Sequence, residues 1–248
     1  MKNVIQFTRI RYIMIVISVI VVAAGITATV MQDGFNLGID FEAGLRQRVE
    51  IGGSGDVEVN TVRDALSGIE AAQVQRVGQP DDNQFSIRVR DPGNVDDFSR
   101  VMSDEVVATL GDEFGETNIV VLETSYVGPR FSQDLAGQAI WLTTLALLLI
   151  LAYIWFRFRL GYAASAIVTL IHDVAIMLGF IGAMQIEVST ATIAAVLTII
   201  GYSLNDTIVI FDRIRENESI LRESPFETIV NTSITQSLSR TLITSLTT

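Results

Sequence analysis

The sequence predicts an α-helical polytopic membrane protein that carries one acidic α+β domain with ferredoxin-like topology. Three observations lead to this fold class. The mean hydropathy is +0.43, and 49% of the residues are hydrophobic while 18% are charged, which is typical of a membrane protein. Four apolar runs can each cross a hydrocarbon core, which takes about 20 helical residues. Residues 32–137 hold 20 Asp and Glu against 8 Lys and Arg, so this block alone accounts for the negative net charge.

The apolar runs set the order of segments along the chain. The first run is too long for the core of a signal peptide, which is about 7–15 residues, and no small-x-small cleavage site follows it. We therefore expect an uncleaved first span rather than a signal peptide. A segment rich in Ser and Thr near the end of the chain is expected to be a partial fifth span, although hydropathy alone does not identify it. The predicted segments are an N-terminus at 1–11, spans at 12–31, 135–156, 160–184 and 188–211, an α+β domain at 32–134, a cytoplasmic loop or helix at 212–232, and the partial span at 233–248.

Basic residues near the span ends predict the orientation in the membrane. Loops that stay in the cytoplasm carry an excess of Lys and Arg. Alternating spans place all three basic groups of this chain on one side, which is then cytoplasmic, and the acidic domain is then extracytoplasmic. These groups are Lys2, Arg9 and Arg11 before the first span, Arg157 and Arg159 between the second and third, and Arg213, Arg215 and Arg222 after the fourth.

The sequence pattern of the acidic block predicts a series of strands and helices. Period-two alternation predicts strands, and apolar residues three and four apart predict helices, the first of them with Asn60 as its N-cap. The resulting order β-α-β-β-α-β is the split arrangement of ferredoxin-like domains. This fold has many functions, so it does not decide the function here. The predicted strands are 45–51, 73–77, 85–89 and 118–127, and the predicted helices are 60–69 and 94–110.

Several function classes are excluded by composition and motifs. The chain has no cysteine and a single histidine, His172, so neither a thiolate site nor a histidine-cluster metal site is expected. No Walker loop, HExxH, GxGxxG or nucleophile–base pair is present. The acidic block would repel nucleic acid. We therefore expect a protein that is not an enzyme, has no cofactor and does not bind nucleic acid.

Asp206 is the most informative residue, because it lies within an apolar run that should be buried in lipid. A carboxylate near mid-membrane costs roughly 2.5–3.5 kcal/mol on insertion scales, so it needs a partner or a proton. Helical spacing places Thr198, Tyr202 and Asp206 on one face, with Ser203 beside them. This polar stripe is expected to face the interior of a helix bundle.

Arg240 is the predicted partner of Asp206. Counting from the span ends at 1.5 Å per residue places Asp206 about 12 Å and Arg240 about 10 Å inside the membrane, so the two charges lie at similar depth. One interpretation is a structural ion pair that locks two helices together. The other is a proton or cation site, in which Asp206 changes its charge and Arg240 biases that change.

His172 and Asp173 form a second polar pair, near the middle of the third span. A histidine beside a carboxylate there could extend a proton path. Alternatively, both side chains satisfy interior polar groups where two helices cross. The residues by themselves leave both interpretations open.

Six motifs, spread in order over the chain, resemble those of SecF, a membrane subunit of the SecD/SecF family, which is related to the RND superfamily. Together they cover both ends of the α+β domain, the third and fourth spans and the final segment. The matching stretches are Gly38-Ile39-Asp40-Phe41, Val127-Gly128-Pro129, Ile171-His172-Asp173-Val174, the run from Gly201 to Val209, the run from Phe211 to Asn217, and the run from Ser239 to Ser245.

The resemblance implies a subunit of the bacterial protein-export machinery in the inner membrane. It implies SecD as a partner, association with the SecYEG channel and often with YajC, contact with a translocating preprotein, and use of the proton gradient, with sodium in some relatives. It maps the family's coupling carboxylate onto Asp206 and its transmembrane arginine onto Arg240. A possible polar path consists of His172, Asp173, Tyr202, Ser203 and Asn205.

The sequence departs from the family pattern at two places. The motif after the first span usually has paired glycines, and Ala43 occupies the first of these positions. The family has six spans, so this sequence is expected to be an incomplete RND-type half bundle, truncated in the fifth. Two rival functions remain: a small-molecule exporter of the RND superfamily, which usually needs larger outer domains, and a non-transporting scaffold that presents the α+β domain.

Overall fold

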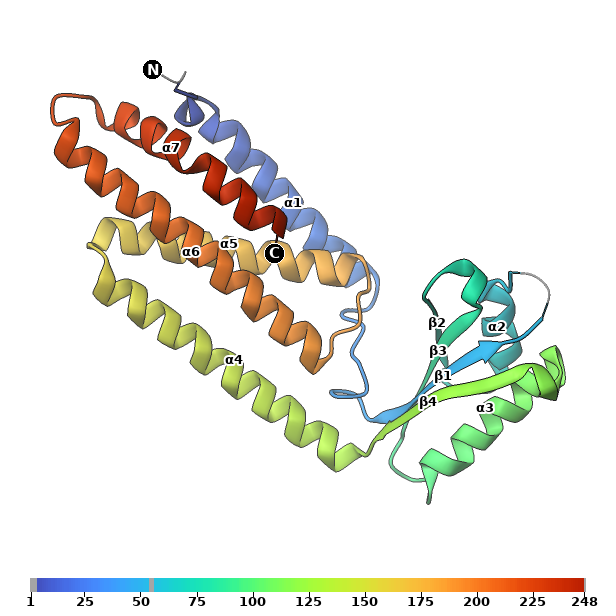
Figure 1. Cartoon of the computed structure of the whole chain (residues 1–248). Helices are drawn as coiled ribbons and strands as arrows, with labels where there is room; N and C mark the ends of the chain where they lie inside the picture. Colours follow the sequence, from blue (N-terminus) through green and yellow to red (C-terminus); the bar gives the residue numbers. More distant parts are fainter. Residues whose placement is uncertain (1–3, 54–55, 248) are drawn as a thin grey trace. The chain divides into compact units, whose positions relative to one another are not determined.

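The computed structural model describes residues 4–53 and 56–247 and divides into two compact units (Figure 1). Residues 1–3, 54–55 and 248 lie outside the described residues, and Lys2 of the predicted basic group is one of them. The membrane unit comprises Met1–Asn36 and Leu142–Thr248, and the α+β unit comprises Leu37–Trp141. The predicted fold class, a helical membrane protein with a ferredoxin-like domain, is confirmed.

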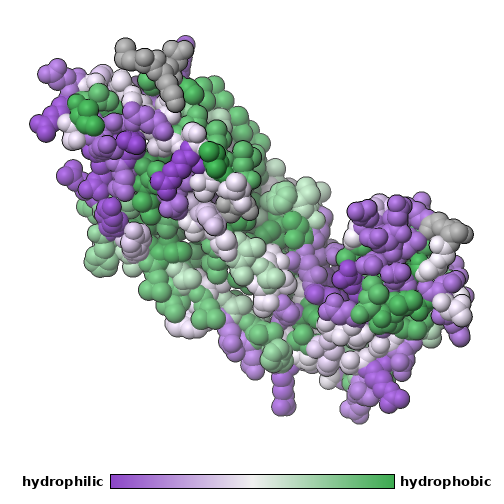
Figure 2. Space-filling model, in the orientation of Figure 1, coloured by the Kyte–Doolittle hydropathy of each residue, from purple (hydrophilic) through white to green (hydrophobic). Residues whose placement is uncertain are grey.

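Five long helices account for most of the helical residues that the structure describes. Four of them are long and apolar enough to cross a membrane, namely the helices that end at Met31, Arg157, Ala183 and Ile220. Hydrophobic side chains cover much of this unit, and hydrophilic ones gather at the end where α6 and α7 are joined (Figure 2). The helices are α1 (Arg11–Met31), α4 (Pro129–Arg157), α5 (Leu160–Ala183), α6 (Thr190–Ile220) and α7 (Phe226–Thr247).

The segment after the fourth predicted span is mostly helical. α6 continues beyond residue 211 to Ile220, and α7 begins at Phe226, so only a short turn separates them. Ion pairs along the exposed end of α6 favour this extension, because residues three apart on a helix are neighbours. Arg213 contacts Glu216 at 2.8 Å, and Arg215 contacts Asp212 at 3.5 Å.

Small residues hold α1 and α5 in close contact. A Cβ added at Gly25 would lie 2.8 Å from the Cα of Gly179, and one at Gly182 would overlap the side chain of Thr29. Thr29 is buried, and its hydroxyl donates to the carbonyl of Gly25 at 2.8 Å. Helices in lipid associate through such close backbone approach, because lipid provides no hydrophobic drive for association.

The α+β unit is a four-stranded antiparallel sheet with two helices. The strand order is β2-β3-β1-β4, which is the ferredoxin-like order that the sequence predicted. The register places Val49 opposite Phe85 and Leu45 opposite Val89. The elements are β1 (Gly44–Ile51), α2 (Val59–Ala65), β2 (Gln73–Val77), β3 (Gln84–Arg90), α3 (Phe98–Phe114) and β4 (Ile119–Val127).

One face of the sheet and the two helices enclose the core of this unit. Alternate strand residues point into the core because successive side chains of a strand lie on opposite faces. The buried members are Leu45, Val49, Ile51, Val74, Phe85, Ile87 and Val89 from the strands, Val62, Leu66, Phe98, Val106 and Leu110 from the helical segments, and Ile69 from the connection before β2.

Both helix starts in this unit differ from the prediction. Asn60 is not the N-cap of α2, because the helix begins at Val59 and Glu58 precedes it in extended conformation. The second helix begins at Phe98 rather than at residue 94, because Asp97 has left-handed backbone angles, with φ of 54°. Val95 therefore lies before the helix and is exposed.

A hydrogen-bond cluster centred on Asp91 joins the ends of three strands. Asp91 directly follows β3 and is buried. Its Oδ2 accepts from the Tyr126 hydroxyl at 2.6 Å, its Oδ1 accepts from the Gly93 amide at 2.7 Å, and its own amide donates to the Ala43 carbonyl at 2.8 Å. The bond to Asp91 raises the pKa of Tyr126 to about 12.

Substituting Tyr126 with Phe should therefore lower the free energy of unfolding of the α+β unit by about 1 kcal/mol at pH 8, the usual contribution of one hydrogen bond. Because folding raises the pKa of Tyr126, the neutral hydroxyl stabilises the folded protein. This stabilisation is complete below the unfolded pKa of about 10 and is lost as pH rises through the folded pKa of about 12. The wild-type advantage should thus decline between these pH values. Denaturant unfolding of both proteins from pH 8 to 12 measures it, and an equal difference at every pH would contradict the assignment.

Candidate functional site

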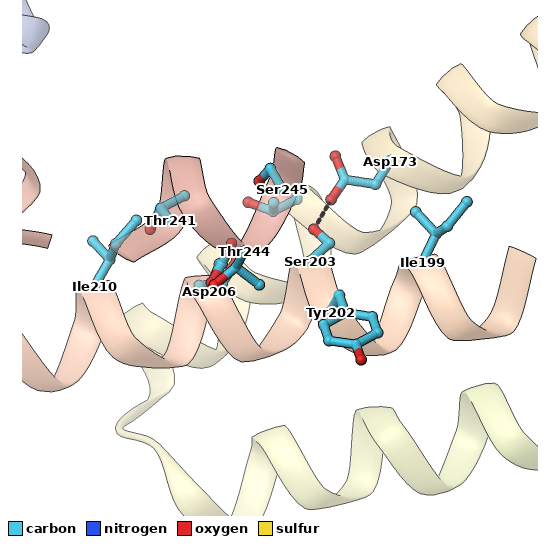
Figure 3. A pocket seen from close by; sticks show the side chains of 11 residues that line it. Asp173, Ile199, Tyr202, Ser203, Asp206, Ile210, Thr241, Thr244 and Ser245 are labelled. Carbon is cyan, nitrogen blue, oxygen red and sulfur yellow. Dashed lines mark hydrogen bonds between the residues drawn. The ribbon is translucent and has the colours of Figure 1, made fainter. Parts of the chain in front are cut away.

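A cavity of about 510 Å³ lies between α5, α6 and α7 in the membrane unit (Figure 3). Its lining includes two carboxylates and a group of hydroxyls among apolar groups. Such a cavity inside an apolar bundle is unusual, because polar groups in lipid are costly unless they serve a function or find a partner. It is lined by Thr169 and Asp173 of α5, Ile199, Tyr202, Ser203, Asp206, Thr207 and Ile210 of α6, and Thr241, Thr244 and Ser245 of α7.

Asp206 is the buried carboxylate of this cavity. Its side chain is only 8% exposed, and its Oδ1 atom has no hydrogen-bond partner among the described residues. An ionised carboxylate without a partner is expensive to bury, since it loses hydration without compensation. The site therefore favours either a bound proton, a bound cation, or water and partner groups from another chain.

The structure joins His172 and Asp173 to two neighbouring helices. The Nδ1 atom of His172 lies 2.9 Å from Oδ1 of Asp173, and its Nε2 contacts the hydroxyl of Ser18 on α1. The hydroxyl of Ser203 on α6 donates to Oδ2 of Asp173 (Figure 3). A continuous hydrogen-bonded chain thus crosses α1, α5 and α6. It ends at Ser203, three residues before Asp206 on the same helix.

The expected ion pair between Asp206 and Arg240 is not formed among the described residues. Arg240 is exposed and does not line the cavity. α7 turns Thr241, Thr244 and Ser245 toward the cavity instead. Residue 240 is displaced from residue 241 by about 100° around the helix axis, since a turn takes 3.6 residues, so matching depth does not by itself bring the charges together.

The other predicted polar residues divide between the cavity and the surface. Tyr202 and Ser203 line the cavity, whereas Asn205 is exposed and lies outside its walls. Their roles, and those of Asp206 and Arg240, stay predictions. Sequence reasoning missed Ser18 and Thr241. A hydroxyl in an apolar helix is too common to stand out, because it can bond to the carbonyl four residues before it.

Two buried asparagines anchor the first half of α7. Asn217 ends one of the motifs that resemble SecF, whereas sequence reasoning missed Asn231. Asn231 donates to Oε1 of Gln6 and to Oγ1 of Thr8, at 3.0 and 2.9 Å. Asn217 of α6 donates to Oγ of Ser233 at 2.8 Å. The N-terminal segment, α6 and α7 are therefore tied together at one end, while the other half of α7 faces the cavity through hydroxyls alone.

Aromatic residues hold α6 against the turn between α4 and α5. The ring of Phe211 lies 5.8 Å from that of Phe158 and 5.2 Å from that of Tyr162. Arg157 contacts Asp212 at 3.5 Å, at the exposed rim of this cluster. The motif that begins at Phe211 thus has a packing role in addition to its charges. Within residues 4–53 and 56–247, no group of three or more His, Asp or Glu is placed to hold a metal ion.

These features define the class: a polytopic membrane protein with a carboxylate held inside its helical unit and a separate ferredoxin-like unit. Comparison with known proteins identifies the family. The family model described as protein export membrane protein SecD/SecF, C-terminal, matches residues 106–248, so the chain belongs to the SecD/SecF family.

The relatives agree with this assignment. Protein translocase subunit SecF of Borreliella burgdorferi is 37% identical over all of this chain and 84% of its own length. SecF of Rhodothermus marinus is 41% identical over 87% of this chain and 70% of its own length. Since such relatives are named translocase subunits, the function shown at this level is that of a subunit of the Sec protein-export machinery.

A solved structure has the same fold. The crystal structure of SecDF from Thermus thermophilus, described as a translocon-associated membrane protein, has a TM-score of 0.81 and 32% identity. The match covers 99% of this chain and 32% of that one, so this chain spans about a third of the SecDF polypeptide. A SecDF structure in a super-membrane-facing form matches with a TM-score of 0.53.

Proposed function

We propose that this chain works with a SecD-type partner in the bacterial inner membrane and uses the proton gradient to assist preprotein translocation. In this proposal the α+β unit is extracytoplasmic, and the complex acts beside the SecYEG channel, with YajC as a further associated subunit. The SecD-type partner is supported by relatives in which both parts form a single SecDF chain. The basic residues at the span ends support the orientation.

The observation that carries the proposal is the buried Oδ1 of Asp206, which lacks a hydrogen-bond partner beside the cavity. Binding a proton removes the cost of the buried charge, and releasing it restores that cost. The free energy difference between the two states can therefore repack α6 against α7. Because only one half of α7 is anchored through Asn231 and Asn217, the half that faces Asp206 is the one expected to move.

The chain from Ser18 to Ser203 supplies a route by which a proton reaches the cavity. Each step joins a donor to an acceptor on an adjacent helix or residue, through His172 and Asp173. Histidine is suited to this role because one ring nitrogen can accept a proton while the other donates one. Arg240 is proposed to meet the carboxylate in the complex with the SecD-type partner. The similar depth of the two residues in the membrane and the family resemblance both support this role.

Gradient-driven export in vesicles tests the coupling ion. Vesicles that contain the complete SecDF–SecYEG machinery, with this chain as the SecF subunit, should lose the contribution of this chain when a protonophore dissipates the proton gradient. Dissipating only the sodium gradient should leave that contribution unchanged. Vesicles without this chain provide the baseline. If sodium alone drives the chain-dependent part of export, the cavity binds sodium and the proton assignment is wrong.

A further inference from the structure

The open face of the sheet in the α+β unit carries a cluster of four arginines, Arg46 and Arg48 from β1 and Arg88 and Arg90 from β3, called here the arginine face. They alternate with core residues such as Leu45 and Val89, so they point to the side away from α2 and α3. Half of the eight basic residues of an otherwise strongly acidic block thus lie on one surface.

The register of the strands brings these charges together. Arg46 lies directly opposite Arg88 in the β1–β3 pair, and Arg90 lies opposite Gly44 two residues further along. Like charges directly opposite each other destabilise a sheet. The folded unit therefore keeps a repulsive arrangement that solubility does not require, because the block is already highly charged.

Neighbouring side chains hold the guanidinium groups in place. Arg48 donates to Oε1 of Gln84 at 2.9 Å, and Arg88 donates to Gln73. Arg90 contacts Glu42 at 2.9 Å. Arginines fixed in this way lose less entropy when they bind a carboxylate through their planar fork of donors.

Two features show unused binding capacity. The Nε atom of Arg48 is buried and has no hydrogen-bond partner among the described residues. A buried donor without a partner destabilises the fold, and a bound ligand that supplies an acceptor removes this cost. In addition, a hollow of about 170 Å³ is lined by two other arginines of the face, Arg88 and Arg90, together with Glu42, Ala71 and Gln73. The hollow is large enough for a carboxylate group.

We propose that the arginine face binds the carboxylates of an extended acidic segment of a polypeptide in transit, an inference that rests on the proposed export function. Side chains on one face of an extended chain repeat every two residues, about 6.6–6.8 Å. This repeat equals the spacing of Arg46 and Arg48 along β1 and of Arg88 and Arg90 along β3.

The charges on the unit argue against a lipid surface as the ligand. The block carries 20 acidic residues, which repel a continuous anionic surface over about a Debye length. Glu123 lies opposite Arg48 in the register, and Glu50 also lies on this face. A single acidic segment can bind in a position where its carboxylates face the arginines and not Glu50 or Glu123. A continuous layer of headgroups cannot avoid these two carboxylates.

A peptide-binding experiment tests the proposal on the full chain in nanodiscs of neutral lipid. The probe is a fluorescent peptide of about 12 residues that alternates Asp and Ser, and the reference probe alternates Asn and Ser. The double variant R46Q/R88Q should bind the Asp peptide about tenfold more weakly than the wild type, a loss of about 1.4 kcal/mol. The Asn peptide should not bind to either protein.

The matched control is the double variant R63Q/R100Q, which removes the same charge from two exposed arginines on α2 and α3. Its affinity for the Asp peptide should equal that of the wild type. Removing Arg46 and Arg88 relieves repulsion between like charges, so a normal unfolding midpoint shows that any loss of binding is not misfolding.

Two results would overturn the proposal. Equal losses in both double variants would show general charge attraction. Failure of the Asp peptide to bind, together with weaker co-purification of the SecD-type subunit by R46Q/R88Q, would assign the face to a contact between subunits. Neither result affects the gradient experiment with the export complex. The peptide-binding proposal and the proposed function can therefore be contradicted independently of each other.

Discussion

Substituting Asp206 with Asn is expected to remove gradient-driven stimulation of export while the protein still folds and assembles. Asn has nearly the same shape but cannot exchange a proton, so the cavity keeps its volume and loses its titratable group. A buried charge in lipid costs roughly 2.5–3.5 kcal/mol, and its removal should leave the stability of the helical bundle unchanged or increased. Export driven by a proton gradient, compared with the same vesicles without a gradient, measures the effect.

The control for this prediction is Glu187→Gln, which makes the same chemical change outside the cavity. Glu187 lies between α5 and α6 and is not a wall residue. We expect it to retain full gradient stimulation. Retention of full stimulation by the Asp206 variant, at normal levels in the membrane, would end the assignment of Asp206 as the coupling carboxylate.

Substituting Gly44 with Ala should have the largest effect on the α+β unit. A Cβ at this position would overlap the backbone carbonyl oxygen of Val89, and a backbone atom within a sheet cannot rotate away. The β1–β3 register begins at this residue, so the strands must separate locally. Overpacking of this kind lowers the free energy of unfolding by about 1–3 kcal/mol. Denaturant unfolding should show this loss, and the amides of β1 and β3 should exchange faster with solvent.

Gly68→Ala is the matched control, because a Cβ there meets no atom within 4 Å. It should leave stability within about 0.5 kcal/mol of the wild type. If the two alanine variants are equally stable, the close approach at Gly44 does not constrain the sheet. The neighbouring Ala43, which departs from the family motif, is buried.

The spans and strands could be predicted because their signals are local. An apolar run of span length is helical in lipid, since every backbone polar group must be satisfied within the segment. Alternation over residues 45–51 predicted the strand β1 from neighbouring residues alone. Helix starts were less predictable. The left-handed conformation of Asp97 delays α3, and that conformation depends on one residue rather than on a repeating pattern.

The candidate site was predictable in its carboxylate but not in its surroundings. Asp206 stands out because a charge in an apolar run is rare. Its neighbours depend on how α7 is rotated, and a rotation of one residue replaces Arg240 with Thr241 in the cavity wall. Ser18 could not be identified from its own helix, because its partner His172 lies on α5, far away in the sequence.

The sequence by itself determined that this is a membrane protein with a ferredoxin-like unit, which residues are apolar enough to span, and that Asp206 needs an explanation. These properties follow from hydropathy and periodicity, which act over a few neighbouring residues. Only the tertiary structure decided that Asp206 faces hydroxyls rather than Arg240, that His172 bridges α1 and α6 through Asp173, and that the arginines share one sheet face. These depend on helix rotation and strand register, which packing between distant segments sets.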